Sequence, residues 1–332
     1  MTRRITVLAG GVGGARFCFG LRHHLAESDA EITVIGNTGD DIWVHGLRVC
    51  PDLDSIMYTL GGGISAERGW GREAETFHAK EELAAYGVEP TWFGLGDRDI
   101  GTHLVRTTSL NSGYSLSDVT AALCHRWNPG VRLLPMTDDR AETHVIVDDS
   151  DTDGEHPLRI AIHFQEWWIR HRASLPAHGF TIVGVEDARP APGVLEAIAD
   201  ADVVLLAPSN PVVSIGTILA VPGIREGLVG GAAPVVGISP IIGGRPVRGM
   251  ADACLRAIGV PTTAGAVAAH YGARSSGGIL DAWLVDTVDA DEVASVAALG
   301  IDCIAMPLLM TDPDATARMA EEALRLAGPR VR

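Results

Sequence analysis

The first residues of the chain combine an apolar segment, a glycine cluster and a helical pattern. Residues 5–9 predict a buried parallel strand, and Gly10-Gly11-Val12-Gly13-Gly14-Ala15 follows them at once. Residues 16–22 then have helical spacing. The free amides and the dipole of a helix N-terminus bind anions, and glycines let a phosphate approach the backbone. The pattern therefore predicts a phosphate site formed by Gly11, Val12, Gly13 and Gly14.

The glycine cluster also fits a tight strand-to-helix turn that only permits close packing of the helix. A Walker A phosphate loop is excluded, because it would need a lysine followed by Ser or Thr. Lys80 is the only lysine of the chain, so lysine cannot hold phosphates at this loop.

The formal net charge of −16 restricts the partners of the chain. Nucleic acids and anionic membranes require a basic face, so we expect neither as a partner. An anionic substrate would have to be held by local arginines and backbone amides. The sequence has no apolar run of about 18 residues and no signal-peptide core, which predicts a cytoplasmic protein. Its five scattered cysteines predict free thiols.

The length of 332 residues permits one large domain with an insertion or two closely packed domains. We predict one α/β nucleotide-binding domain over 1–332, with a three-layer, Rossmann-like, mostly parallel sheet. Strand signals are sparse at about 56–127, where we predict a mainly helical insertion over the ligand edge of the sheet. Within it, helices are expected at 73–86 and 117–127, with Ser117 as the cap of the second.

Polar residues follow several predicted strands. The strand at 32–35 runs into Gly36-Asn37-Thr38-Gly39-Asp40-Asp41, which favours a metal or another polar ligand, although an Asn- and Asp-rich turn would also fit. The strands at 203–207 and 235–238 are followed by Pro208-Ser209-Asn210 and Ser239-Pro240. Because ligands of open parallel sheets bind beyond the carboxyl ends of the strands, these loops predict a nucleotide cleft.

The remaining elements complete the predicted sheet. Strands are expected at 131–136, 279–286 and 303–308, and an antiparallel pair at 144–147 and 158–164 encloses an acidic turn at 148–155. Residues 165–172 mix aromatic, basic and amide side chains, which an amphipathic packing helix explains only in part. An amphipathic helix at 314–326 is expected to pack locally or in a homodimer.

Two acidic segments precede or begin predicted helices. In Cys50-Pro51-Asp52-Leu53-Asp54, the carboxylate of Asp54 could cap a helix with Asp52 just before it, and capping explains only one of the two. Asp97-Arg98-Asp99 is expected on a glycine-flanked loop, either at the ligand site or as a surface ion-pair turn.

Eight motifs occur in a fixed order over nearly the whole chain. They are Gly10–Gly14, Asn37–Asp41, Cys50–Asp54, Leu95–Asp99, Leu134–Asp139, His163–Trp168, Pro208–Pro211 and Ser239–Gly243. Together they resemble the 2-phospho-L-lactate transferase family of coenzyme F420 biosynthesis, called CofD in archaea and FbiA in mycobacteria.

The resemblance implies a group transfer. A phosphoenolpyruvyl or 2-phospho-L-lactyl group would move from its guanosine diphosphate ester to the ribityl hydroxyl of the deazaflavin Fo, releasing GMP with magnesium as the cofactor. A glycine cradle and a divalent cation suit this chemistry, which depends on positioning and charge neutralisation. All but one of the 26 Lys and Arg residues are arginines, a bias that suggests an actinobacterial source and hence the phosphoenolpyruvyl donor.

By motif position, the resemblance implies that Asp54 and Arg98 bind Fo. Asp54 could orient or deprotonate the attacking hydroxyl, and Arg98 could hold ligand oxygens or developing charge. The other candidates are chosen mainly because they follow strand ends. They are Asp40 and Asp41, with Asp54 as a third, for magnesium; Asn37, Ser209, Asn210 and Ser214 for the guanosine phosphate; and Trp43 and Trp168 for the deazaflavin ring.

Two rival functions belong to other classes. YvcK-like proteins share the glycine loop and look like nucleotide-sugar-binding regulators, but the segments 50–54 and 96–99 favour the transferase. An NAD(P) oxidoreductase is disfavoured by the paired Asp40 and Asp41 after the second strand and by the lack of an evident hydride-transfer site.

Overall fold

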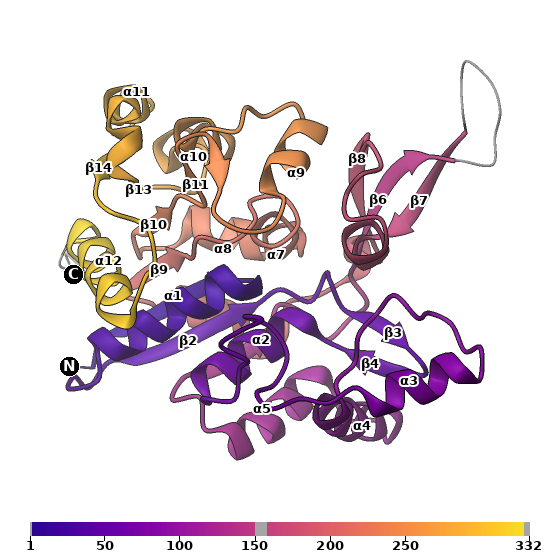
Figure 1. Cartoon of the computed structure of the whole chain (residues 1–332). Helices are drawn as coiled ribbons and strands as arrows, with labels where there is room; N and C mark the ends of the chain where they lie inside the picture. The colour runs from indigo at the N-terminus through magenta and orange to yellow at the C-terminus, as the bar shows by residue number, and fades with distance from the viewer. Residues whose placement is uncertain (1, 150–157, 329–332) are drawn as a thin grey trace.

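The computed structural model describes residues 2–149 and 158–328. Its centre is a parallel sheet of seven strands in the order β14-β13-β10-β9-β1-β2-β5 (Figure 1). The strands are β1 (Arg4–Ala9), β2 (Glu31–Gly36), β5 (Arg132–Pro135), β9 (Val203–Leu206), β10 (Val235–Ile238), β13 (Ala282–Val285) and β14 (Asp302–Ala305). The order runs outward in opposite directions from β1 and β9, as in Rossmann-like sheets. The predicted fold class is confirmed.

Helices cover both faces of this sheet, which makes three layers. The period of two along a strand explains this, since Val7 of β1 packs in one core while its neighbour Leu8 packs in the other. The helices that share the core of Val7 are α1 (Gly11–His24), α2 (Pro51–Leu60), α5 (Leu116–Trp127) and α12 (Pro313–Leu326). Those that share the core of Leu8 are α6 (Val194–Ala199), α7 (Ile215–Ala220), α8 (Ile224–Gly230), α9 (Ala251–Ala257), α10 (Ala264–Tyr271) and α11 (Val293–Ala297).

The region at 56–127 contains α3 (His78–Ala85), α4 (Asp97–Asn111) and α5, next to a short hairpin of β3 (Ile42–Val44) and β4 (Leu47–Val49) that the sequence did not predict. Helix α3 is shorter than the expected 73–86, because the segment before it turns away to cap α4. The carboxylate of Glu75 accepts hydrogen bonds from the backbone N of Arg98 and Asp99, at 2.6 and 3.2 Å. In return, the carboxylate of Asp97 accepts from the backbone N of His78 and Ala79, at 3.0 and 2.9 Å.

Three local predictions were wrong. Residues 97–99 form the first turn of α4 rather than a loop, because Glu75 satisfies the free amides of that turn. Asp54 does not cap α2; it lies inside the helix, which begins at Pro51 with Cys50 in the cap position. Helix α5 is capped by Ser115, whose hydroxyl accepts from the backbone N of Asp118, and not by Ser117.

A second, antiparallel sheet projects from the body beside α9 (Figure 1). It has the order β7-β6-β8, with β6 (Glu142–Asp148), β7 (Arg159–His163) and β8 (Gly179–Val183). The expected pairing of the first two strands is confirmed, β8 was not predicted, and most of the acidic turn at 148–155 lies outside the described residues. Residues 166–170 form a π-helix, Glu166–Arg170.

The smaller elements are a two-stranded ribbon and three 3₁₀-helices. The ribbon pairs β11 (Ile241–Ile242) with β12 (Arg245–Pro246), and the 3₁₀-helices span Val185–Asp187, Arg274–Ser276 and Thr287–Glu292. The five cysteines are free thiols, as expected. Among the described residues, every helix is too short or too polar to cross a bilayer.

Candidate functional site

A cavity of about 1090 Å³ lies at the carboxyl ends of the central strands, where the strand order reverses between β1 and β9. Its walls come from the loop after β1, the loop after β9 and the starts of α2 and α4. This is the place where open parallel sheets bind ligands. The helical region at 56–127 contributes Tyr58, Lys80, Asp99 and His103 to the lining.

The glycine loop both lines the cavity and packs tightly. Gly10, Gly11, Val12 and Gly13 line it. Gly14 is absent from the lining and packs against the loop after β9, where a Cβ would lie 2.7 Å from Ser209 Oγ. A Cβ on Gly10 would lie 2.6 Å from Asp52 Oδ2, so a side chain there has no room. The same segment therefore forms both a tight turn and part of the cavity wall.

Ser209 ties the loop after β9 to the glycine loop. The backbone N of Gly10 donates to its Oγ at 3.0 Å, and that Oγ donates to the Gly10 carbonyl at 2.8 Å. Asn210 and Ser214 also line the cavity. The Asn210 side-chain carbonyl accepts from the backbone N of Val212 at 2.9 Å, which fixes the loop.

Asn37 lies behind the cavity wall and holds two carboxylates that line it. Its side-chain N donates to Asp52 Oδ2 at 2.9 Å and to Asp40 Oδ1 at 3.3 Å. Asn37 itself is fully buried and is absent from the lining. Burial, and then the neighbouring charge of Asp52, raise the pKa of Asp40 well above its usual value. Burial also raises the pKa of Asp52 to about 6. Two such carboxylates facing one cavity favour a bound cation.

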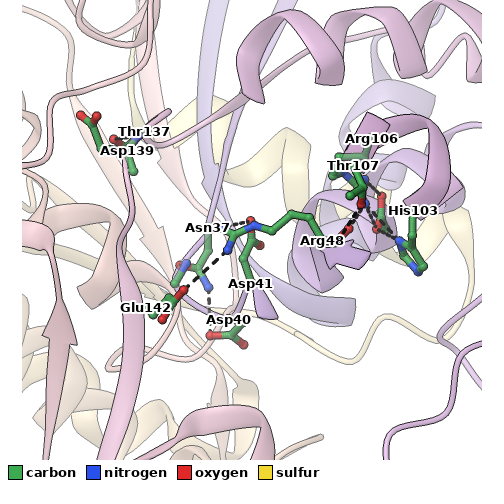
Figure 2. Close-up of polar contacts among 12 residues, drawn as sticks. Asn37, Asp40, Asp41, Arg48, His103, Arg106, Thr107, Thr137, Asp139 and Glu142 are labelled. Atoms are coloured by element: carbon green, nitrogen blue, oxygen red, sulfur yellow. Dashed lines mark hydrogen bonds and ion pairs between the residues drawn. The ribbon is translucent and has the colours of Figure 1, made fainter. Parts of the chain in front are cut away.

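Asp41, by contrast, is absent from the cavity lining. Its carboxylate forms an ion pair with Arg48 (Figure 2). Arg48 donates to Asp41 Oδ2 at 3.1 Å, and its other terminal N lies 3.7 Å from Glu142 Oε1. Arg48 thus joins the β3–β4 hairpin to the projecting sheet. Burial raises the pKa of Asp41 to about 6, although the charge of Arg48 opposes the shift.

Asp54 lines the cavity, but its carboxylate is bound to Arg106 of α4. Both oxygens accept from the guanidinium, with Nη1 donating to Oδ2 at 3.1 Å and Nη2 donating to Oδ1. Both side chains are buried. The same Nη1 lies 3.1 Å from Nδ1 of His103 (Figure 2), whose ring also lines the cavity. Asp54 is therefore held rigidly at the wall.

The other predicted residues divide between the cavity and the surface. Trp168, the middle residue of the π-helix, lines the cavity. Trp43 is 50% exposed on β3 and is absent from the lining. Arg98 is exposed in the first turn of α4 and is also absent from the lining, whereas its neighbour Asp99 is present. The roles of Trp43 and Arg98 in binding Fo stay predictions.

Sequence reasoning passed over several residues of the cavity. Asp52 and Asp99 stand inside motifs that were recognised, and helical spacing could have shown which member of each motif faces inward. His103 of the cavity wall, and Arg106 behind it, follow Asp99 at helical intervals of four and seven residues along α4. That signal was hidden because residues 97–99 were expected to be a loop.

The fold and the cavity together define a class of protein. A Rossmann-like sheet with a glycine loop and a carboxylate-lined cavity at its switch point is typical of α/β enzymes that bind their ligands there. A family model described as "2-phospho-L-lactate transferase CofD" matches residues 5–302, and the chain belongs to this family.

Curated relatives resemble the chain over nearly its full length. A "Phosphoenolpyruvate transferase" of Streptomyces coelicolor is 67% identical, covering 98% of both chains. One of Mycobacterium sp. strain JLS is 60% identical, covering 98% of this chain and 99% of the relative. The solved structure of BH3568 from Bacillus halodurans has a TM-score of 0.61 at 18% identity, covering 98% of this chain and 100% of that one, so this likeness concerns the fold alone. The family resemblance predicted from the motifs is confirmed.

Proposed function

We propose that this chain transfers the phosphoenolpyruvyl group from enolpyruvyl-2-diphospho-5′-guanosine to the ribityl hydroxyl of Fo, giving dehydro-F420-0 and GMP. The 2-phospho-L-lactyl ester, which would give F420-0, is the alternative donor. The observation that carries the proposal is one cavity lined both by a glycine loop and by aspartates from two different helices. The relatives named phosphoenolpyruvate transferase, at 60–67% identity, favour the first donor.

The donor would lie at the glycine end of the cavity. The loop that contains Gly11 and Gly13 can approach its phosphates closely, and Ser209 and Ser214 offer hydroxyls beside it. Four cationic side chains also line the cavity, and within the described residues none forms an ion pair or a hydrogen bond through its charged group. They are Arg16, Lys80, Arg172 and Arg248. In so acidic a chain, unpaired cations at one cavity support an anionic substrate.

Magnesium fits Asp40, which was predicted as a ligand, and Asp52, which was not, better than the predicted Asp41 and Asp54. Both carboxylates line the cavity, and within the described residues neither forms an ion pair with an arginine. Asp41 and Asp54, by contrast, are paired with Arg48 and Arg106. The described residues contain no group of three or more His, Cys, Asp or Glu that could hold a metal, so substrate oxygens and water would complete the shell. A bound magnesium would neutralise charge on the diphosphate.

Transfer would proceed at the phosphorus of the phosphoenolpyruvyl group. The ribityl oxygen forms a new bond to this phosphorus, and the bond from phosphorus to the oxygen kept by GMP breaks. The hydroxyl proton leaves toward a carboxylate or water. Asp54 lies at the wall two residues after Asp52, where it could orient the hydroxyl, and Trp168 offers a face for the deazaflavin ring.

The decisive experiment is a product analysis. The purified protein is incubated with Fo, magnesium and each of the two guanosine diphosphate esters, and the deazaflavin product is identified by mass. We expect dehydro-F420-0 and GMP from the enolpyruvyl ester, and no product in excess EDTA. Full activity in EDTA would reject the metal-assisted scheme. No product from either ester, with thermal stabilisation by UDP-sugars but not by Fo, would favour a YvcK-like regulator.

Asp52→Asn tests the metal site separately from folding. The substitution keeps the shape of the side chain and removes one of two mutually repelling buried charges, so the folded state should keep its stability. Transfer should fall by about two orders of magnitude, and the thermal shift caused by magnesium should disappear. The predicted homodimer can be tested by light scattering of the same samples.

A further inference from the structure

Helices α2 and α4 hold a carboxylate at the cavity that the motif-based roles do not use. Asp99 Oδ1 accepts a hydrogen bond from the Tyr58 hydroxyl at 2.6 Å. Its other oxygen, Oδ2, lies 3.5 Å from Nε2 of His103. All three side chains line the cavity, and the Asp99 side chain is 16% exposed. The Tyr58 hydroxyl therefore fixes one oxygen of Asp99, the other oxygen lies beside the His103 ring, and part of the carboxylate stays open.

The neighbours of His103 and Tyr58 determine where these two side chains carry their protons. Arg106 must donate to Nδ1 of His103, so a neutral imidazole carries its proton on Nε2, which faces Asp99. That Nε2 is buried and has no hydrogen-bond partner among the described residues. Burial and the charges of Asp54 and Asp99 raise the pKa of Tyr58, so its hydroxyl keeps its proton and donates. Although burial opposes it, the neighbouring His103 and the Tyr58 hydroxyl hold the pKa of Asp99 below its usual value.

Asp99 differs from Asp54 and Arg98, the two residues assigned by motif, in how its charged group faces the cavity. Both oxygens of Asp54 are occupied by Arg106, and the Arg98 side chain is exposed outside the cavity lining. Asp99 is charged, rigid and partly open to the cavity. An ionised carboxylate with an open oxygen accepts hydrogen bonds from hydroxyl donors.

The helix gives the position of this carboxylate relative to the reacting groups. Asp52 meets the glycine loop, and Tyr58 follows it by six residues, or about 9 Å along the axis of α2. Asp99 bonds to Tyr58, and the His103 ring lies beside both Asp99 and Asp54, with Nε2 3.5 Å from Asp99 Oδ2 and Nδ1 3.8 Å from Asp54 Oδ2. If Asp54 orients the attacking hydroxyl, a group bound at the neighbouring Asp99 belongs to the same chain of the acceptor.

We propose that Asp99 accepts a hydrogen bond from a hydroxyl of the polyol chain of the acceptor, and that Tyr58 and His103 are positioning residues for its carboxylate. The inference rests on the proposed function and adds a specificity element to it. Asp99 would select acceptors whose chain carries further hydroxyls besides the attacking one, which is the group that Asp54 would orient.

The test pairs one substitution with one change in the ligand. Binding of Fo, and of a deazaflavin whose ribityl chain is replaced by an unsubstituted alkyl chain, is measured by fluorescence titration of the full chain and its Asp99→Asn variant. In the variant the Tyr58 hydroxyl takes the amide oxygen, which turns the NH₂ group toward the ligand. We expect about ten- to hundredfold weaker binding of Fo, the loss typical of one hydrogen bond to a charged group. Binding of the alkyl analogue should change less than about twofold, since it lacks the interacting group.

The controls separate the possible failures. Asp29→Asn changes an exposed aspartate in the same chemical way and should leave binding of both ligands unchanged. Equal weakening of both ligands in Asp99→Asn would show a structural role and overturn the inference. If the unmodified protein binds neither deazaflavin, the proposed function itself fails.

Tyr58→Phe provides a second variant in case Asp99→Asn does not fold. It removes one donor to Asp99 and keeps the buried ring. We expect the KM for Fo to rise several-fold while kcat and GMP binding stay unchanged, because only the orientation of the carboxylate is affected. A fall in kcat with an unchanged KM would contradict a positioning role.

Discussion

The two ends of the cavity are built from different interactions. At the glycine end, backbone groups and short side chains meet in tight contacts at the tips of β1 and β9, as between Gly10 and Ser209. At the helical end, charged side chains of α2 and α4 pair with one another away from solvent, as between Asp54 and Arg106. The first end depends on shape and the second on the pairing of buried charges. The two should therefore fail in different ways when a residue is changed.

The largest effect is expected when the buried charge pair is broken. Arg106→Leu leaves the Asp54 carboxylate buried without its partner, and a single removal from a buried pair costs about 3–5 kcal/mol of unfolding free energy. Urea denaturation measures this loss, which could prevent folding altogether. The double variant Asp54→Asn/Arg106→Leu should recover part of it, because no unpaired charge remains.

A matched control uses an exposed arginine. Arg256 forms an i,i+4 ion pair with Asp252 on α9, so Arg256→Leu should leave the urea midpoint nearly unchanged. If Arg106→Leu were as mild as this control, the helical end would be solvated in solution, and the contrast between the two ends would disappear.

A smaller effect is expected at the glycine end. Gly10→Ala places a methyl group 2.6 Å from Asp52 Oδ2 and 2.7 Å from Ser214 Cβ. Overpacking of this kind costs about 1–3 kcal/mol. The shift would also displace Asp52 and widen the cradle, so GMP binding, measured by calorimetry, should weaken more than Fo binding. Equal weakening of both ligands would mean that the glycine loop does not distinguish donor from acceptor.

The same contrast shows what the sequence could reveal. The seven parallel strands and the glycine loop were predictable because buried strands are continuous apolar runs and their polar loops collect at one edge. Gly11 and Gly13 were accordingly placed at the cavity. The hairpin at 42–49 and strand β8 were missed, since short strands resemble loops in pattern.

The helical end was predicted only in part, because the orientation of each side chain there depends on a partner that is distant in the sequence. Asp54 was identified, but nothing near it in the sequence indicates that Arg106 holds it. Asp41 looked equivalent to Asp40, yet Arg48 draws it away from the cavity while Asn37 holds Asp40 at the wall. Residue types and their spacing in the sequence show where polar side chains occur. Which of these side chains contact one another is determined by the fold.

Gly101→Ala tests whether the helical end tolerates a methyl group that the glycine end does not. Gly101 lies inside α4, is exposed, and a Cβ there would meet nothing within 4 Å. Replacing a helix-interior glycine by alanine should raise the unfolding free energy by about 1 kcal/mol. Thermal unfolding measures the gain. Destabilisation instead would mean that residues 97–111 are not a helix in solution and that Asp99 is placed differently.

The smallest effect is expected for Arg98→Ala. This variant tests whether Arg98 has the role that its motif position implies, although its side chain lies outside the cavity lining. The side chain is exposed and its guanidinium has no bonded partner in the described chain, so the urea midpoint should not move. If Arg98 binds Fo as its motif position implies, the KM for Fo should rise about two- to fivefold, as for loss of an exposed ionic contact, with GMP binding unchanged. An unchanged KM would remove Arg98 from the site. Asp99 would then be the residue through which this turn of α4 contacts the acceptor, because it faces the cavity and its neighbour does not.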